Sequence, residues 1–430
     1  MATIKKSQQH DEKKLYFPEG ALLNMMDVAV VESERRKSEY IKEPFTVYLV
    51  ESRPVENAPS FHPGSALWRR YSEFDLLRNY LMAVYPYIVM PPLPEKRVLH
   101  FQINVEKLQI ATDKFEPDFV ERRRQGLECF LLRLSSHPTI SQDSIFRAFL
   151  SQEDGWKDSV MGTQWQQKVD NRLKSLTASM IIKSTDKQFE NIKSYCESLN
   201  TNIAALLKVQ QRLTDRSAAL TKRHSEYGKL MSEWSGVERE MGDVLQQAGH
   251  QMDRLAAQTT STLNEEEVAY TDQLKEYLYF TDSLRTMVRK QNLRQWELER
   301  GEESLSDKSR QKEELIREVQ ILENGGELPP PTTGLKTVQK LIFGDETLEQ
   351  KQVKVLTLED QMREAESSVE AAQVEVAGFT EKSLKDFERF KKQKVRDINE
   401  IMENYIKTQI KVNKLGVQQW QTMKEYFQSM

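Results

Sequence analysis

The chain has 430 residues, of which 38% are hydrophobic and 30% are charged, and its formal net charge is only −4. A chain of this length is expected to form two or three domains. With so small a net charge, affinity for a polyanion has to come from local basic patches, and no nucleic-acid partner is expected. No run approaches the roughly 18 apolar residues of a membrane-spanning helix. The polar start, 1-MATIKKSQQHDEKKLYF-17, lacks the apolar region of a secretory signal, and the only two cysteines indicate a reducing cytosolic compartment.

The distribution of proline divides the chain. Of the 14 prolines, eleven lie between Pro18 and Pro138, and the other three are consecutive at 329–331. Proline costs about 3 kcal/mol inside a helix because it removes a donor and clashes with the preceding turn. The pattern therefore predicts a mixed N-terminal part and a helical C-terminal part, with one break at the triple proline.

The N-terminal part predicts a small α+β domain with a three-stranded antiparallel sheet. Runs rich in β-branched and aromatic residues are typical of strands, and an apolar face at helical spacing is typical of a helix. We expect strands at 26–34, 45–53 and 66–71, and helices from Ser72 to about 85, from Pro117 to about 136 and over 141–151.

The C-terminal part predicts an all-α domain of three long helices. Apolar residues such as Phe189, Ile192, Cys196 and Leu199 alternate spacings of three and four, and the same alternation returns over 355–379. This pattern is typical of a helical bundle or a coiled coil. We expect helices at about 189–234, 263–324 and 346–428. The last would be about 120 Å long at 1.5 Å per residue, so its apolar stripe should meet its neighbours and a second chain.

The chain lacks the common catalytic signatures. It contains no phosphate-binding glycine loop, no GxSxG and no HExxH, and its six histidines show no ligand spacing. His224 falls on the apolar stripe of the first long helix, where a packed histidine is the ordinary explanation. We therefore expect no enzyme, no metal and no cofactor.

Three basic motifs stand out in the N-terminal part: 68-WRRYSEF-74, 91-PPLPEKR-97 and 121-ERRRQG-126. An arginine fork suits phosphate oxygens, and an adjacent aromatic ring can form a floor under a cyclic polyol. Three prolines stiffen an extended loop that ends in a lysine, which is a mobile point charge. Each motif alone is explained by exposed charges on unrelated elements, but their order and placement together indicate a site for a phosphate-bearing lipid head group.

The three motifs resemble those of the phox-homology (PX) domain, a reader of phosphatidylinositol 3-phosphate. The resemblance implies that Arg70 holds the 3-phosphate, that Tyr71 stacks under the inositol ring and that Lys96 contacts the 1-phosphate. It implies Arg123 as the ligand of the 4- and 5-hydroxyls, with Arg124 as the second choice.

Further roles follow from the same resemblance. Ser72 would help to hold the phosphate pocket, and Arg69, one strand position before Arg70, should face away as a structural residue or a peripheral membrane contact. After the proline loop, three apolar residues are candidates to insert into the bilayer, with packing on the domain's own loop as the alternative: Val98, Leu99 and Phe101.

The helical half resembles a BAR domain, the crescent-shaped dimer of three-helix coiled coils. Lys391, Lys392 and Lys394 are candidates for a basic membrane-facing surface, with a solvated helix face as the alternative. The segment 164–182 could be an amphipathic wedge in the membrane or could pack the two domains together.

Together these features resemble the PX–BAR sorting nexin family. We expect a disordered tail at 1–23, a PX domain at 24–152, a linker with an amphipathic helix at 153–185 and a BAR dimerisation domain at 186–430. The resemblance implies a non-enzymatic protein that binds phosphatidylinositol 3-phosphate membranes and senses or shapes tubules, supporting cargo recycling and autophagy.

The same family resemblance implies the partners and the location. The partners would be a second copy or another PX–BAR sorting nexin, transmembrane cargo and motor adapters. The location would be cytoplasmic, on the cytosolic face of early and recycling endosomes. The alternative is a PX-targeted adapter whose long helices recruit motor or signalling partners without bending the membrane.

Overall fold

The computed structural model describes residues 21–38, 41–56, 63–95, 116–168, 183–184, 186–326 and 347–429. The chain divides into two compact units. The first is drawn from 1–170, 194–285 and 387–430, and the second from 171–193 and 286–386.

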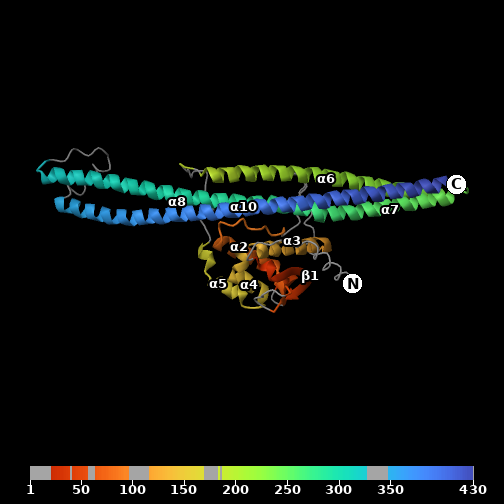
Figure 1. Cartoon of the computed structure of the whole chain (residues 1–430), viewed down its shortest axis with the longest axis horizontal. Coiled ribbons are helices and arrows are strands. Elements are labelled where there is room, and N and C mark those ends of the chain that lie inside the picture. The colour runs from red at the N-terminus through yellow and green to blue at the C-terminus, as the bar shows by residue number, and fades with distance from the viewer. Residues whose placement is uncertain are drawn as a thin grey trace. The chain divides into compact units, whose positions relative to one another are not determined.

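The first unit begins with an antiparallel sheet in the order β1-β2-β3 (Figure 1). Its strands are β1 (Met26–Ser38), β2 (Ile41–Pro54) and β3 (Ser65–Arg70). The predicted three-stranded antiparallel sheet is confirmed, although β1 and β2 run further than expected. They extend through charged residues because an antiparallel ladder is held by backbone hydrogen bonds and can leave one face in water. A bulge between Val30 and Glu32 interrupts the register of β1 with β2.

The described residues of this α+β domain also form helices α2 (Tyr71–Val84), α3 (Pro117–Ser136), α4 (Ser144–Ser151) and α5 (Trp156–Gly162). Helix α3 starts with proline in its first turn, where the missing N–H costs nothing, and α4 is capped by the Asp143 carboxylate, which accepts from the Phe146 N–H at 2.8 Å. The predicted helix faces are confirmed, because Phe74, Leu77 and Leu81 are fully buried.

The domain has one apolar core that runs from Leu22 to Trp165 in sequence. Phe149 lies near its centre, with its ring edge-to-face on Phe74 at 5.2 Å and on Trp156 at 5.1 Å. The core therefore continues past residue 152 into the segment expected to be a linker. Trp165, which the sequence analysis considered for a membrane wedge, packs into this core, while 169–182 lies outside the described residues.

The rest of the described chain consists mainly of long helices: α6 (Lys187–Ser235), α7 (Gly242–Glu266), α8 (Asp272–Glu323) and α10 (Leu348–Gln428), with a π-helical turn at Glu267–Thr271. The all-α prediction is confirmed. The second helical stretch begins at Gly242, about twenty residues before the expected start. Glycines at 242 and 249 lower the local helix propensity, which explains why the pattern missed this part.

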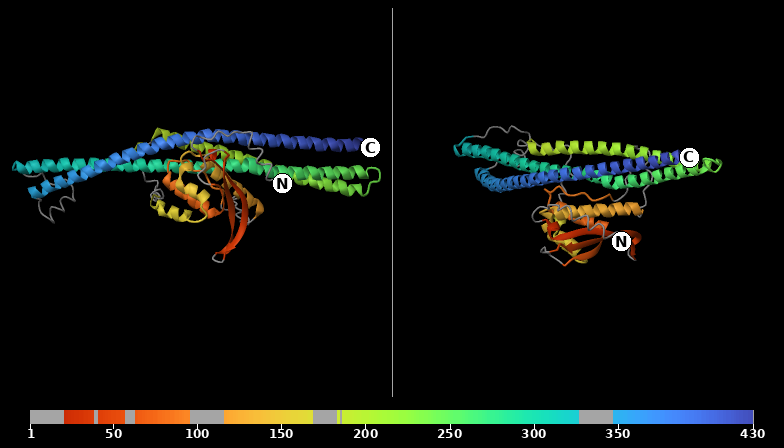
Figure 2. Two further views of the ribbon diagram at one scale, coloured as in Figure 1. Left: turned by 60° about the horizontal axis from the view of Figure 1, so that its bottom comes forward. Right: turned by 45° about the vertical axis from the view of Figure 1, so that its right-hand side comes forward.

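Gly249 has a packing role. A Cβ atom there would come within 2.7 Å of the Gly228 carbonyl oxygen, so α6 and α7 approach each other through a pair of glycines. The two helices lie side by side in the views of Figure 2. Close backbone approach thus compensates the low helix propensity of glycine at this crossing.

In the second unit, α8 and α10 pair antiparallel. Gln291 contacts Thr380, Arg294 contacts Glu375 at 2.9 Å, and Lys312 contacts Glu359 at 2.8 Å. Increasing residue numbers along α8 are therefore paired with decreasing residue numbers along α10. Gly301 faces Val369, whose Cγ2 would lie 3.1 Å from a Cβ at position 301. None of the described helices combines the length and the apolar content needed to cross a bilayer.

Candidate lipid-binding site

Arg69 and Arg70 at the end of β3 point to opposite faces, as alternation along a strand requires. Arg69 is only 1% exposed, and its guanidinium donates to the carbonyl oxygens of Phe149 at 2.8 Å and Glu153 at 3.1 Å. It closes the C-terminal end of α4, and burial lowers its pKa. This confirms Arg69 as a structural residue and excludes the alternative of a peripheral membrane contact.

Arg70 is the last residue of β3 and lies on the other face. Its backbone N–H donates to the Glu73 carboxylate at 2.7 Å, which fixes the turn from strand into helix α2. Its guanidinium carbon lies 4.0 Å from the centre of the Phe45 ring on β2. Arg70 is half-exposed at the end of the strand, and its guanidinium lies over an aromatic ring.

Tyr71 begins helix α2 and lies beside Arg123 of helix α3. The Arg123 guanidinium carbon is 5.1 Å from the centre of the Tyr71 ring, and the Tyr71 hydroxyl donates to the Pro94 carbonyl at 2.6 Å. Burial raises the pKa of Tyr71 to about 12, so this phenol remains a neutral donor. The structure thus brings together Tyr71, Arg123 and the proline loop. Ser72, next in α2, is exposed.

Arg123 and Arg124 have different surroundings, which separates the two choices left open by the sequence. Arg124 donates to the carboxylates of Glu121 at 2.7 Å and Glu128 at 2.8 Å, and to the Val30 carbonyl. It ties α3 to β1, and its hydrogen bond to Glu121 is the main reason that its pKa is raised. Arg123 is the arginine that faces Tyr71.

Residues 91–95, here called the proline loop, are fastened by side chains from both neighbouring helices. The Arg78 Nε donates to the Pro91 carbonyl at 3.1 Å, and the Arg123 Nε donates to the Glu95 carbonyl at 3.3 Å. A Cβ at Gly126 would lie 2.7 Å from the Pro94 Cβ, so only glycine lets α3 approach the loop this closely. The remaining predicted residues, Lys96, Val98, Leu99 and Phe101, lie outside the described residues.

Helix α8 also contacts this loop, and sequence reasoning missed it. The Ser283 hydroxyl donates to the Met90 carbonyl at 2.7 Å, and the Tyr279 hydroxyl donates to the Glu95 carboxylate. No role in the site is expected for α8 from the sequence, because nothing in its pattern links it to a loop about 190 residues earlier. Only the density of aromatic residues in 277-YLYF-280 marked this stretch.

A largely buried polar cluster joins α3 to the long helices of the same unit. The Arg133 guanidinium donates to the Glu276 carboxylate at 2.6 Å and to the Asp397 carboxylate at 2.7 Å, and Tyr277 also donates to Asp397. Glu276 raises the pKa of Arg133 well above its ordinary value despite the opposing effect of burial, and burial raises the pKa of the neighbouring Cys129 thiol to about 12. Arg133 thus remains charged where the N-terminal domain meets α8 and α10.

The three candidate lysines on α10 do not share one environment. The Lys391 amine pairs with Glu388 at 2.6 Å and lies 5.1 Å from the centre of the Phe387 ring, and the Lys394 amine lies 5.4 Å from the centre of the Tyr195 ring. Lys392 is exposed. The basic membrane face at these lysines remains a prediction.

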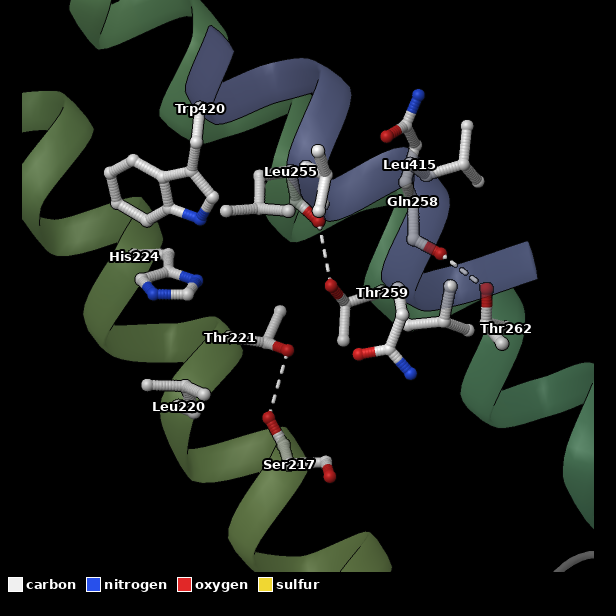
Figure 3. A pocket seen from close by; sticks show the side chains of 14 residues that line it. Ser217, Leu220, Thr221, His224, Leu255, Gln258, Thr259, Thr262, Leu415 and Trp420 are labelled. Carbon is white, nitrogen blue, oxygen red and sulfur yellow. Dashed lines mark hydrogen bonds between the residues drawn. The ribbon is translucent and has the colours of Figure 1, made fainter. Parts of the chain in front are cut away.

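A hollow lies between α6, α7 and α10 (Figure 3), with a volume of about 360 Å³. His224 and Trp420 face each other in it with their ring centres 6.2 Å apart. His224 is half-buried, so it packs on an aromatic ring at an open surface. No group of histidine, cysteine and acidic residues suited to a metal occurs in the described parts of the chain.

Comparison with known proteins identifies the family and the fold. The PX domain family model matches residues 62–153. Sorting nexin-4 from mouse and from human are each 42% identical over 415 residues, which is 95% of this chain and 88% of theirs. Sorting nexin-30 from Xenopus tropicalis is 24% identical over 68% of this chain and 64% of its own length. A solved structure, the SNX-BAR Mvp1 tetramer, has the same fold, with a TM-score of 0.56 and 17% identity over 92% of this chain and 99% of that one.

An α+β domain that matches the PX family model, followed by long helices with the fold of an SNX-BAR protein, defines a PX–BAR sorting nexin, and the chain belongs to the sorting nexin family. The basic motifs, together with 232-SEWSGVEREMGDVLQQAGH-250, resemble sorting nexin 4. The extent of the match to mouse and human Sorting nexin-4 confirms a member near that protein.

Proposed function

We propose that the chain binds phosphatidylinositol 3-phosphate through Arg70, Tyr71 and Arg123, with Lys96 and Ser72 completing the site. The observation that carries this proposal is the grouping of Tyr71, Arg123 and the proline loop next to the strand end that presents Arg70. An aromatic floor with two guanidinium groups at its edge suits a phosphorylated inositol ring. Membership of the family supports an endosomal sorting role at the membrane.

Binding of vesicles that contain phosphatidylinositol 3-phosphate by the Arg70→Ala variant tests this site. We expect binding to weaken by more than about tenfold, because one charge-assisted phosphate contact contributes roughly 1.5–3 kcal/mol. Arg53→Ala is the matched control, since Arg53 is an exposed arginine of the same sheet that pairs with Glu51. Wild-type affinity in the Arg70→Ala variant would refute the pocket, provided that vesicles without the lipid bind neither variant.

The second part of the proposal is that the helices form a dimer that senses or shapes tubules, with Lys391, Lys392 and Lys394 toward the membrane. A dimer carries two head-group sites, and its second site binds at a raised effective concentration. Cargo recycling and autophagy are the processes that such a protein would serve on early endosomes. Support comes from the apolar residues exposed along α6 and α10 and from the fold shared with a tetrameric SNX-BAR protein.

An adapter that recruits motor or signalling partners without bending membranes is the second candidate function. The half-buried positions of Lys391 and Lys394 beside aromatic rings favour it, since they leave Lys392 as the exposed member of that group. Electron microscopy of vesicles incubated with the chain separates the two. Tubules, or preferential binding to small vesicles, indicate curvature activity, whereas binding without either effect indicates an adapter.

A further inference from the structure

The proline loop cannot hold itself in place. Pro91, Pro92 and Pro94 have no N–H, so the loop has few donors with which to form a turn of its own, while its carbonyl groups still require partners when they are buried. The carbonyls of residues 90, 91, 94 and 95 each accept a side-chain donor from outside the loop. The position of the loop is therefore decided by the helices around it.

Those donors come from three helices, and one of the three belongs to the helical region. Arg78 and Tyr71 lie on α2 and Arg123 lies on α3, all within the PX domain, whereas Ser283 and Tyr279 lie on α8. The two α8 residues are one helical turn apart and fasten the two ends of the segment 90–95. Ser283 is buried with the Met90 carbonyl, and Tyr279 reaches the Glu95 side chain. Lys96 follows Glu95 directly in the sequence.

We propose that Tyr279 and Ser283 of α8 are positioning residues of the phosphoinositide site, which makes the affinity of the PX domain for a single head group depend on the helical region. The inference rests on the proposed function. A site holds its ligand well only when its groups are kept within about 0.5 Å of the productive geometry by a second layer of contacts. Without the two α8 hydroxyls, the Met90 carbonyl loses the Ser283 donor and the Glu95 carboxylate loses the Tyr279 donor.

Local electrostatics is consistent with this role. Burial raises the pKa of Tyr279, and the Glu95 carboxylate raises it further, so the hydroxyl stays protonated and donates. Arg78, which holds the Pro91 carbonyl, has its pKa lowered by burial, and Asp282 of α8 partly offsets this effect. Charge on α8 thus also acts on an arginine that fastens the loop.

The test is calorimetric titration of the full chain with inositol 1,3-bisphosphate, the soluble head group of phosphatidylinositol 3-phosphate. A soluble head group binds one site at a time, so avidity of a dimer does not enter. We expect Tyr279→Phe and Ser283→Ala each to weaken binding about two- to fivefold, and the double variant about tenfold, because a single hydrogen bond contributes roughly 0.5–1.5 kcal/mol. Tyr270→Phe is the matched control, since Tyr270 packs on Tyr405 with ring centres 4.5 Å apart.

Two further variants separate positioning from a merely structural role. Glu95→Gln keeps an oxygen that accepts from Tyr279, so its affinity should stay within about twofold of wild type. Combining Glu95→Ala with Tyr279→Phe should weaken binding no more than the stronger single variant, because both remove the same hydrogen bond. If the double variant Tyr279→Phe/Ser283→Ala melts at a lower temperature yet binds the head group like wild type, the inference is refuted.

The outcomes distinguish this inference from the function on which it rests. A wild-type chain that gives no heat with inositol 1,3-bisphosphate refutes both the proposed function and the positioning role. A wild-type chain that binds, with Arg70→Ala inactive and the double α8 variant unchanged, refutes the positioning role alone. A wild-type chain that binds, with Arg70→Ala inactive and the double variant weakened at an unchanged melting temperature, supports both.

Discussion

The PX domain and the long helices differ in how far their large apolar side chains are buried. Among the described residues of the PX domain, the exposed large hydrophobic side chains are Val31 and Met161. Along the helices they form a long series: Leu206, Val209, Leu213, Leu220, Tyr227, Leu230, Trp234, Val237, Ile321, Val353, Leu356, Val374, Val395, Met402, Ile406, Ile410, Val417, Trp420 and Phe427. The PX domain buries its large apolar side chains within one chain, whereas the long helices expose an apolar surface that one chain does not cover.

The spacing of the exposed series explains this difference. Leu206, Leu213, Leu220 and Tyr227 are seven residues apart, which places them on one stripe of α6. An apolar stripe of this length in water marks an interaction surface, because isolated exposed hydrophobic residues are ordinary but continuous patches are not. We expect a second chain to cover it. The contacts described between the two regions are polar: an ionic group of Arg133, Glu276 and Asp397, and the hydrogen bonds of Ser283 and Tyr279.

Truncation of a core residue of the PX domain should give the largest loss of stability. Phe149 is fully buried between Phe74 and Trp156, so Phe149→Ala leaves a cavity that costs about 3–5 kcal/mol. Chemical denaturation followed by tryptophan fluorescence measures this loss. A loss below about 1 kcal/mol would contradict a closed core. Met161→Ala, an exposed residue of the same domain, is the control and should change stability by less than about 0.5 kcal/mol.

Disruption of the charged group of Arg133, Glu276 and Asp397, here called the ionic junction, should lower stability nearly as much. Arg133→Ala leaves Glu276 and Asp397 without their shared partner, and breaking a buried pair costs about 3–5 kcal/mol. We place the loss near the lower end because Asp397 keeps the donor Tyr277. Limited proteolysis and thermal unfolding measure it. The combined variant Arg133→Met/Glu276→Met should recover much of the loss, and an equally unstable combined variant would show that shape rather than charge decides the junction.

Charge placed on the apolar stripe should change association instead of folding. Leu220 is 57% exposed, and a carboxylate there has no cost in one chain but is buried in a dimer. Leu213→Asp/Leu220→Asp should raise the dissociation constant of the dimer by about 100-fold while leaving helicity unchanged. Light scattering across a dilution series measures the effect. Met161→Asp is the control, and an unchanged dissociation constant in the double variant would place the interface elsewhere.

The sequence predicted the fold class well because both halves carry strong local patterns. Strand alternation, proline placement and the heptads of α6 and α10 specify their elements without long-range information. Helix α7 was missed in part because Gly249 reduces local propensity while serving a helix crossing that only the structure shows. The extension of the core to Trp165 was missed because a lone tryptophan does not reveal what it packs against.

The residues of the candidate site likewise divide into those that local sequence patterns indicate and those that only the structure shows. Arg70 and Tyr71 stand out in the sequence because they are adjacent and lie at a strand end, and strand alternation predicted that Arg69 faces away from Arg70, which left open whether it is structural or a membrane contact. The choice between Arg123 and Arg124 depended on helix phase and on the acids around Arg124. Ser283 and Tyr279 could not be found, since their contacts to residues 90 and 95 cross almost 190 positions and follow no repeat.

The smallest expected effect concerns a buried polar layer between helices α6, α7 and α10. This layer belongs neither to the apolar core of the PX domain nor to the exposed apolar stripe of the helices. Glu266 of α7 is 7% exposed and accepts hydrogen bonds from Gln210 of α6 and Gln409 of α10. Burial raises the pKa of Glu266, so the folded chain binds this proton more readily than the unfolded chain. The carboxyl therefore favours folding at acidic pH, and stability falls as pH rises through its folded pKa.

Glu266→Gln should accordingly raise the stability of the chain at pH 7 by less than about 1 kcal/mol, since the amide removes a buried charge but keeps one acceptor for the two glutamine donors. Melting temperatures from pH 4 to pH 8 measure this change. The gain should shrink toward acidic pH, where the wild-type carboxyl is protonated, and Glu265→Gln on the exposed side of α7, which removes the ion pair with Lys411, should not reproduce it. A variant less stable than wild type at pH 7 would contradict this prediction. It would mean that the charged carboxylate is itself the preferred partner of Gln210 and Gln409, so that charge stabilises the polar layer as it stabilises the ionic junction.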